Sequence, residues 1–360
     1  MQQSFPQFYR KRSLTMGNKA VFMTDLKKME TREIPMPQAK NDQVVIKLEY
    51  VGICGSDVHY LENGRIGDFV VDGDFILGHE CAGTITEVGS DVHELKVGDR
   101  VCLEPGFGCG KCDYCKSGHY NLCKEMQFLA TPPIQGCLSN YIAFPADMCF
   151  KLPDNISTKE GALIEPLAIG MYAATRGEVT VGSSVVILGA GCIGLVTLLA
   201  CKAFGASDIT VCDVIPSRLE AAKRLGATRV VNGREENVIE VINQLTGGRG
   251  VDKVFETAGN KFTTQQTADL VRPGGVVVLV GMAPDDMIPY NFVKMISKEA
   301  DIRTIFRYVN MYPKAIQAVA SGAIDISGIV THEYTFDKTY EGFMEVIANA
   351  KDVVKAVIKF

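Results

Sequence analysis

The sequence predicts an α/β protein of two domains, one with a doubly wound parallel sheet and one rich in β-strands. The chain has 360 residues, which is too long for one ordinary hydrophobic core. Residues 181–305 alternate apolar strands with stretches of helical length, the pattern of parallel βαβ units with right-handed crossovers. Residues 16–166 instead contain short apolar stretches between glycine, proline and acidic turns, which is typical of a β-rich domain.

The elements expected in the parallel-sheet domain, residues 167–306, follow one another in regular order. Pro216 suits the first position of one of its helices. The expected strands are 185–188, 209–212, 230–231, 251–256 and 276–280, and the expected helices are 192–204, 216–225 and 235–245.

The two ends of the chain need separate expectations. Residues 307–360 mix helix and strand but cannot form a core alone, so we expect them to join residues 16–166 in one domain. Residues 1–15 are expected to be a flexible extension, or to precede an alternative start at Met16. Three basic residues without an acid in this segment would also suit a targeting peptide.

Composition excludes several classes of partner. The formal net charge is -5 and no basic block stands out, so neither nucleic acid nor an anionic membrane is expected to bind. Residues 179–201 are uncharged, but three glycines interrupt them, which indicates a strand, a turn and a buried helix rather than a membrane span. The 12 cysteines occur in a long chain without a secretory signal, which favours reduced thiols and a cytoplasmic location.

A glycine-rich turn predicts a nucleotide site. Gly189, Gly191 and Gly194 follow an expected strand and open an expected helix, where they permit a tight turn and close approach to a pyrophosphate. Asp213 ends the next strand at roughly the 20-residue spacing that this motif requires. A carboxylate there binds the ribose hydroxyls and repels the 2′-phosphate of NADP, which indicates a Rossmann domain that binds NAD. The alternative is that Asp213 only caps the helix beginning near Pro216.

Four cysteines at close spacing predict a structural zinc site. The segment 108–123 contains glycines that let the chain wrap tightly, and four thiolates complete a tetrahedral Zn²⁺ shell without leaving an open position. An iron–sulfur cluster is the competing interpretation, although no second cysteine set is present, and a disulfide is disfavoured in a reducing compartment. The four ligands are Cys109, Cys112, Cys115 and Cys123.

A second, catalytic zinc site is indicated by residues spread over the first 165 positions. Cys54, His79 and Glu80, with Glu165 further along, provide a thiolate, an imidazole and one or two carboxylates. This donor set suits a Zn²⁺ that keeps one position for water or substrate.

These motifs together resemble a known family, and the resemblance covers almost the whole chain after Met16. The stretch Gly78-His-Glu-x2-Gly83-x5-Gly89-x2-Val92, together with Cys54-Gly-Ser56, the four-cysteine segment and the glycine-rich turn, is similar to zinc-containing medium-chain dehydrogenases. The β-rich domain would then be GroES-like. More narrowly, the segments 55–60, 64–67, 164–167 and 306–308 look like those of sorbitol/xylitol dehydrogenases.

Two departures refine the resemblance. Liver-type alcohol dehydrogenases would have a zinc-binding cysteine where Glu165 stands, which counts against a simple ethanol enzyme. Mammalian sorbitol dehydrogenases lack the four-cysteine zinc loop, so the chain is more similar to microbial polyol dehydrogenases.

The resemblance implies a role for individual residues. Cys54, His79 and Glu80 would hold the catalytic zinc, and Glu165 would act through the metal's water or exchange with Glu80 as a direct ligand. Substrate hydroxyls would be contacted by Tyr60, Glu165, Arg307 and Tyr308. The cofactor would be held or lined by Gly189, Gly191, Ile193, Gly194, Asp213, Arg218, Val280, Gly281, Met282, Ile305, Phe306 and Arg307.

The expected activity is hydride transfer between a polyol and NAD, giving a ketose, on two zinc ions per subunit. Ser56 would take the substrate proton and His59 would pass it toward solvent, with a water held by Glu165 as the other route. The resemblance implies a homotetramer or homodimer. A threonine or other secondary-alcohol dehydrogenase is the nearest alternative, and a non-catalytic NAD-binding protein is a remote one.

Overall fold

The middle of the chain forms a six-stranded parallel sheet in the order β15-β14-β13-β16-β17-β18. We describe it from a computed structural model, which covers residues 16–283 and 287–360; the expectation for residues 1–15 lies outside this range. The strand order reverses beside β13, as in doubly wound sheets that bind dinucleotides. The strands are β13 (Ser184–Leu188), β14 (Asp208–Asp213), β15 (Arg229–Asn232), β16 (Val251–Glu256), β17 (Val271–Leu279) and β18 (Asp301–Thr304).

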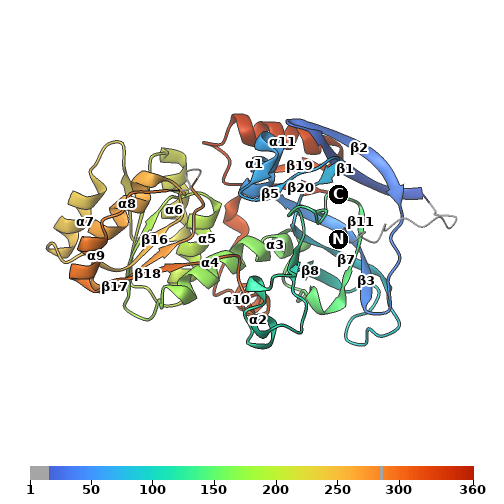
Figure 1. Cartoon of the computed structure of the whole chain (residues 1–360), viewed down its shortest axis with the longest axis horizontal. Helices are drawn as coiled ribbons and strands as arrows, with labels where there is room; N and C mark the ends of the chain where they lie inside the picture. The colour runs from blue at the N-terminus through green and yellow to red at the C-terminus, as the bar shows by residue number, and fades with distance from the viewer. Residues whose placement is uncertain (1–15, 284–286) are drawn as a thin grey trace, which may run out of the picture.

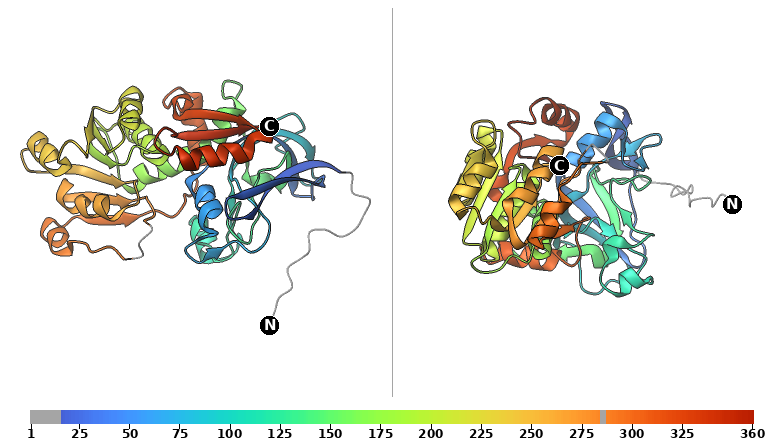
Figure 2. Two further views of the ribbon diagram at one scale, coloured as in Figure 1. Left: turned by 90° about the horizontal axis from the view of Figure 1, so that it is seen from above. Right: turned by 60° about the vertical axis from the view of Figure 1, so that its left-hand side comes forward.

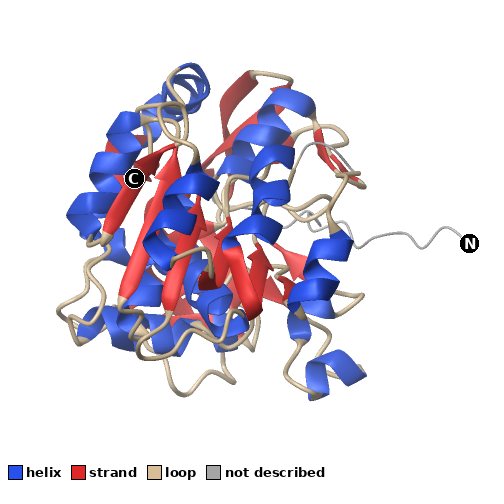
Figure 3. Cartoon of the chain, turned by 90° about the vertical axis from the view of Figure 1, so that its left-hand side faces the viewer, coloured by secondary structure: helices blue, strands red, loops and turns tan. Residues whose placement is uncertain are grey.

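Helices lie on both faces of this sheet (Figure 3). They are α4 (Ile164–Arg176), α5 (Cys192–Ala203), α6 (Pro216–Leu225), α7 (Val238–Thr246), α8 (Lys261–Leu270) and α9 (Phe292–Lys298). A further helix, α10 (Tyr312–Ala320), packs against α4, and its Tyr312 donates to the carbonyl of Leu103 in the β-rich unit. The α/β prediction is therefore confirmed, but the expected start of one helix at residue 235 is wrong. The side chain of Asn237 accepts hydrogen bonds from the amides of Ile239 and Glu240, so α7 begins at Val238.

The second unit is built on a seven-stranded sheet with the path β12-β8-β7-β3-β20-β19, on which β11 also pairs with β3. A smaller sheet, β2-β1-β6, lies beside it, and Figure 1 shows this β-rich unit next to the parallel-sheet unit. The strands are β1 (Met16–Asp25), β2 (Lys28–Pro35), β3 (Gln43–Ile53), β6 (Phe75–Ile76), β7 (Glu80–Val88), β8 (Arg100–Leu103), β11 (Tyr141–Pro145), β12 (Cys149–Lys151), β19 (Val330–Thr335) and β20 (Lys355–Lys359).

The shorter elements of this unit border the site described below. They are the helices α1 (Gly55–Asn63), α2 (Asp113–Lys116), α3 (Thr158–Ala162) and α11 (Thr339–Ala348), the 3₁₀ helix η1 (Tyr120–Leu122), and the strand pairs β4 (Arg65–Ile66) with β5 (Phe69–Val70) and β9 (Gly106–Phe107) with β10 (Gln127–Phe128).

The C-terminal segment returns to the β-rich unit. β20 pairs antiparallel with β3, so that Ala356 lies opposite Ile53, and β19 extends the sheet in parallel with β20. α11 packs against α1 and β2, as the red and blue segments in Figure 2 show. The boundaries expected at 166/167 and 306/307 remain predictions; the first of them falls inside α4, so this helix joins both units.

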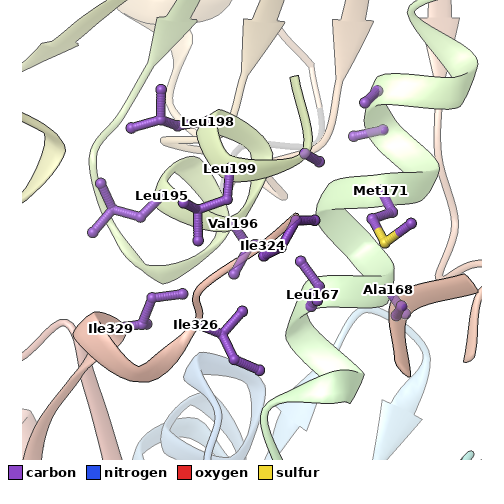
Figure 4. Packing of buried hydrophobic residues seen from close by; sticks show 14 of the residues in the cluster. Leu167, Ala168, Met171, Leu195, Val196, Leu198, Leu199, Ile324, Ile326 and Ile329 are labelled. Atoms are coloured by element: carbon purple, nitrogen blue, oxygen red, sulfur yellow. The ribbon is translucent and has the colours of Figure 1, made fainter. Parts of the chain in front are cut away.

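The largest apolar core lies between α4, α5 and the segment that follows α10. Figure 4 shows Leu167, Ala168 and Met171 of α4 near the leucines of α5 and the isoleucines of residues 324–329. Gly170 allows this approach, because a Cβ there would lie 2.6 Å from the backbone of Val196. Since α4 begins at Ile164, this packing also fixes Glu165 at the boundary between the two units.

No helix in the described ranges is long and apolar enough to cross a membrane. The uncharged run 179–201 is divided between β13, the glycine-rich turn and α5, as expected from its three glycines.

Candidate active site and metal centres

Cys54, His79 and Glu80 come together at the ends of two neighbouring strands. Cys54 follows β3 and caps α1, while His79 and Glu80 stand at the start of β7, which pairs with β3. Their ligand atoms all lie within 4.8 Å of one another. Gly52 leaves room for this arrangement, because a Cβ there would lie 2.0 Å from Oε2 of Glu80.

Asp57, which the sequence analysis did not identify, orients two members of this cluster. Its Oδ2 accepts a hydrogen bond from the amide of Cys54 at 3.2 Å, and its Oδ1 accepts one from Gly78 at 2.9 Å. The same Oδ1 lies 3.5 Å from Nδ1 of His79. Burial disfavours a charged imidazole, but Asp57 and Cys54 together raise the pKa of His79 well above its usual value. The negative field that does this also favours a bound cation.

Lys355 is a second residue that the sequence analysis missed. Its Nζ donates to both carboxylate oxygens of Glu80, at 2.7 and 2.8 Å, and to the carbonyl of Ile53 at 3.1 Å. Both side chains are buried, and the surrounding anionic groups outweigh desolvation and raise the pKa of Lys355. A single lysine within the apolar stretch 353–358 was the available signal, because a buried lysine requires a partner.

Glu165 lies near this cluster but is not one of its three members. It stands in the first turn of α4, where its Oε1 accepts a hydrogen bond of 2.9 Å from the hydroxyl of Tyr308. Burial raises the pKa of Glu165 to about 7, even though His79 acts in the opposite direction. This carboxyl group can therefore hold or release a proton near neutral pH.

Arg307 precedes Tyr308 in sequence and lies close enough to Tyr60 to act on its pKa. The guanidinium of Arg307 stacks 3.9 Å from the ring centroid of Phe128, and its Nη2 donates to Oγ1 of Thr131 at 3.3 Å. Desolvation lowers the pKa of Arg307 to about 10, and burial raises the pKa of Tyr60 to about 12 although Arg307 opposes this shift. Phe128 also lies 5.6 Å from the ring of His79, so it contacts both Arg307 and a residue of the metal-binding cluster.

The two residues expected to move the substrate proton lie on α1. Ser56 is half-buried close to Cys54, whereas His59 is exposed one turn further along. The Nδ1 atom of His59 is 3.4 Å from the side-chain Nδ2 of Asn63.

The four cysteines of segment 109–123 converge around α2 and η1, with their Sγ atoms within 4.8 Å of one another. A Cβ on Gly108 would lie 2.7 Å from Sγ of Cys115, so glycine leaves the space that the cluster occupies. Backbone amides of Lys111 and Cys112 lower the pKa of Cys109 to about 7, while desolvation raises the pKa of Cys115 to about 12. Four thiol groups at this separation form a donor set that fits zinc.

The glycine-rich turn connects β13 to α5, at the carboxyl edge of the parallel sheet. A Cβ on Gly194 would lie 1.9 Å from the carbonyl oxygen of Gly189, whereas one on Gly191 would meet no atom closer than 3.8 Å. Gly194 therefore permits the close strand–helix contact, and Gly191 leaves the backbone open to a phosphate group.

Asp213 ends β14 and binds this turn directly. Its Oδ2 accepts from the amide of Ala190 at 2.6 Å, and its Oδ1 accepts from Val214 and Ile215. The helix that follows has no side-chain cap, so the alternative interpretation of Asp213 as only a cap for α6 does not describe its contacts. A pocket of about 530 Å³ opens beside Asp213 and is lined by Gly189, Val214, Asn237, Ala258, Asn260 and Thr263 among others.

The other residues expected to contact the cofactor lie around the same edge. Arg218, on α6, donates to the carbonyl of Ala350 and lies 3.8 Å from a Cβ built on Gly191. The amides of Val280 and Gly281, after β17, donate to the carbonyl of Glu256 at the end of β16. Met282 and Phe306 are exposed, and Ile193 and Ile305 are partly buried against the main core.

Fold and site together define an oxidoreductase class, and comparison with known proteins identifies it. Residues 40–154 match the family model of the alcohol dehydrogenase GroES-like domain, and residues 192–321 match that of the zinc-binding dehydrogenases. The chain therefore belongs to the zinc-containing medium-chain dehydrogenases.

Individual relatives place it in the polyol dehydrogenase branch. A sorbitol dehydrogenase of Bacillus subtilis (strain 168) is 46% identical over 340 residues, which are 94% of this chain and 96% of the relative. A D-xylulose reductase of Morganella morganii is 44% identical over 304 residues, 84% of this chain and 89% of the relative. The crystal structure of an Escherichia coli oxidoreductase/dehydrogenase of unknown specificity, described as involved in membrane biogenesis, superposes with a TM-score of 0.92 at 45% identity, covering 96% of this chain and 99% of that one.

Proposed function

We propose that this chain oxidises a secondary hydroxyl of a sugar alcohol to a ketone, with transfer of the hydride to NAD⁺ and release of one proton. One observation carries the proposal: the Cys54–His79–Glu80 cluster lies near the buried carboxyl group of Glu165, which accepts a hydrogen bond from Tyr308, the neighbour of Arg307 in sequence. The similarity to sorbitol dehydrogenase and D-xylulose reductase over most of the chain supports the choice of a polyol.

We propose Cys54, His79 and Glu80 as the protein ligands of a catalytic zinc. A bound Zn²⁺ would lower the pKa of a hydroxyl group placed against it. With Nδ1 of His79 facing Asp57, its Nε2 is the nitrogen left for the metal. Glu80 is favoured over Glu165 as direct ligand, because its carboxylate belongs to the 4.8 Å cluster and that of Glu165 does not.

The substrate hydroxyls would meet groups of complementary character. Glu165 accepts from Tyr308 through Oε1, which leaves its other oxygen to accept from a substrate hydroxyl or a water. Arg307 and Tyr60 would supply donors from the opposite side. Ser56 would accept the proton that leaves the substrate, and the exposed His59 would pass it to solvent.

NAD would bind with its pyrophosphate at the turn 189–194 and its adenosine ribose at Asp213. The carboxylate favours the two ribose hydroxyls and repels a 2′-phosphate, so NAD is favoured over NADP. Arg218 would contact the adenosine end, and the nicotinamide would lie against Val280–Met282 and Ile305–Phe306. The cofactor supplies the hydride acceptor, while this chain supplies its orientation.

The cysteines 109, 112, 115 and 123 would hold a second, structural zinc.

We further propose a homodimer or homotetramer in the cytoplasm. The edge strand β18 has an exposed Ile302, and three apolar residues of the neighbouring α9, Phe292, Val293 and Ile296, are also exposed. An open sheet edge beside such residues is suited to pairing with a second copy.

The experiment is a panel of alcohols with NAD⁺, with NADH formation followed by absorbance. Sorbitol, xylitol, galactitol and arabinitol test the polyol assignment, while threonine and butane-2,3-diol test the nearest alternatives. We expect oxidation of at least one sugar alcohol that a zinc chelator abolishes. Turnover of threonine or the diol alone would retain the chemistry and overturn the substrate class.

A further inference from the structure

The segment Phe306–Asn310, which carries Arg307 and Tyr308, has an unusual backbone. Arg307 and Asn310 have φ values of 57° and 54°, in the left-handed region that side chains other than glycine rarely adopt. Such residues persist where their surroundings hold them in place, and they concentrate at functional sites. The question is therefore which contacts hold this segment.

Both ends of the segment are held by η1, the 3₁₀ helix inside the four-cysteine segment. The Nδ2 of Asn121 donates to the carbonyl of Phe306 at 2.8 Å, before the first strained residue. The amide of Asn310, the second residue with a positive φ, donates to the hydroxyl oxygen of Tyr120 at 2.8 Å. Tyr120 in turn donates to Glu104, which follows β8. α2 and α10 accordingly lie next to one another in Figure 1.

The four-cysteine cluster fixes the positions of the Tyr120 and Asn121 side chains. Tyr120 and Asn121 lie between Cys115 and Cys123, so the geometry of the four-cysteine cluster sets their position. Asn121 is only 5% exposed. Its Oδ1 has no hydrogen-bond partner among the described residues, so the bond to Phe306 is the one polar contact that its amide group makes there.

We infer that Tyr120 and Asn121 are positioning residues, through which the structural metal loop sets Arg307 and Tyr308 for a polyhydroxy substrate. The two hydrogen bonds bracket these residues and hold the strained backbone, so that Tyr308 reaches Glu165 and Arg307 stacks on Phe128. The four-cysteine loop then has a role in substrate selectivity as well as in stability. This inference rests on the proposed function, in which Arg307 and Tyr308 contact the substrate.

Two variants separate positioning from stability. Asn121→Leu keeps the branched shape of the side chain but removes the bond to Phe306. It also removes a buried, unpaired oxygen, so we expect the melting temperature to change little. Tyr120→Phe removes the hydroxyl that accepts from Asn310 and donates to buried Glu104, so we expect a lower melting temperature in this variant and compare its kinetics well below that temperature. Tyr114→Phe is the matched control, because Tyr114 lies in the same loop, is 47% exposed, and its hydroxyl makes no hydrogen bond with the described residues.

The readouts are KM and kcat for the best polyol, KM and kcat for butan-2-ol, KM for NAD⁺, zinc content and melting temperature. We expect the KM for the polyol to rise about tenfold in each variant, the effect of one lost buried hydrogen bond. KM and kcat for butan-2-ol, which has one hydroxyl, and KM for NAD⁺ should stay within twofold of the wild-type values. Zinc content should not change. Tyr114→Phe should match the wild type in every readout.

An unchanged ratio of polyol to butan-2-ol kcat/KM in a folded, zinc-loaded variant would overturn the inference. So would an equal loss for both alcohols, which would indicate general disturbance of the site. If Asn121→Leu does not fold, Tyr120→Phe decides the question. A wild-type protein inactive toward every polyol would instead reject the proposed function.

Discussion

At the scale of single residues, the site is a group of buried charges that need one another. Glu80 is paired with Lys355, His79 with Asp57, and Glu165 with the hydroxyl of Tyr308. Burying charges is unfavourable unless each has a partner, and a zinc ion among Cys54, His79 and Glu80 would complete the balance.

Lys355→Met should markedly destabilise the protein stripped of zinc by a chelator, because it then leaves the carboxylate of Glu80 buried without a cation. We expect a lower midpoint of urea denaturation, equivalent to roughly 3 kcal/mol. Lys359→Met, on the same strand but exposed, is the matched control and should change stability by less than ~0.5 kcal/mol. Equal midpoints for the two variants would show that the buried pair does not contribute as described.

Site residues could be predicted from the sequence where a local motif indicates them, and were missed where their role depends on long-range contacts. Cys54, His79 and Glu80 were predicted as a set because their residue types and motifs indicate a metal, and the structure brings them together. Asp57 and Phe128 were missed because their contacts depend on chain segments far apart in sequence, and an aspartate or phenylalanine alone has many ordinary roles.

At the scale of elements, the ends of strands and the loops between them position the chemistry. β3 and β7 deliver Cys54, His79 and Glu80, and the turn after β13 delivers the nucleotide site. Hydrophobic patterns predicted the parallel strands well, because buried parallel strands are short continuous apolar runs. The helix α1 was not predicted, because Gly55–Asn63 is largely polar and has little helical periodicity. The start of α7 was predicted at residue 235 instead of Val238, because the capping role of Asn237 was not recognised.

Cys112→Ala tests the four-cysteine loop as a metal-binding element. The loss of one thiolate should release one zinc per chain and lower the melting temperature by roughly 5 °C or more. Cys201→Ala, at a buried cysteine of α5 outside both clusters, is the control and should keep the full zinc content. Unchanged zinc content in Cys112→Ala would argue against this site.

Asp252 ties together three elements of the parallel sheet, and its contribution should depend on pH. It accepts from the amide and hydroxyl of Ser184 and from Nε of Arg272, which outweigh desolvation and lower its pKa to about 2. Because its pKa in the folded protein lies below the unfolded value of about 3.9, the stabilisation is present above pH 4 and is lost as pH falls toward 2.

Asp252→Asn should therefore lower stability by ~1–2 kcal/mol at neutral pH, and the difference from the wild type should shrink between pH 4 and 2. Urea midpoints of both proteins, each stripped of metal by a chelator, provide the comparison. A difference that stays constant over this pH range would mean that the carboxylate is not preferentially ionised in the folded state.

At the scale of the whole molecule, the site forms because the fold brings together segments that are far apart in the sequence. β20 brings Lys355 to the first unit, α4 brings Glu165 to the boundary, and residues 306–310 bring Arg307 and Tyr308 from the end of the parallel sheet. The fold class and the two kinds of site were predicted from motifs and periodicity. The contacts of Tyr120 and Asn121 with residues 306–310 were not, since nothing local in either segment indicates the other.

The most direct test of the account measures zinc content and NADH formation on the same samples of wild type and Cys54→Ser. We predict two zinc ions per chain and chelator-sensitive oxidation of a sugar alcohol in the wild type. Cys54→Ser should retain one zinc, remain folded, bind NAD as before, and lose nearly all turnover, because Cys54 belongs to the catalytic cluster alone. Turnover retained in Cys54→Ser would contradict the account.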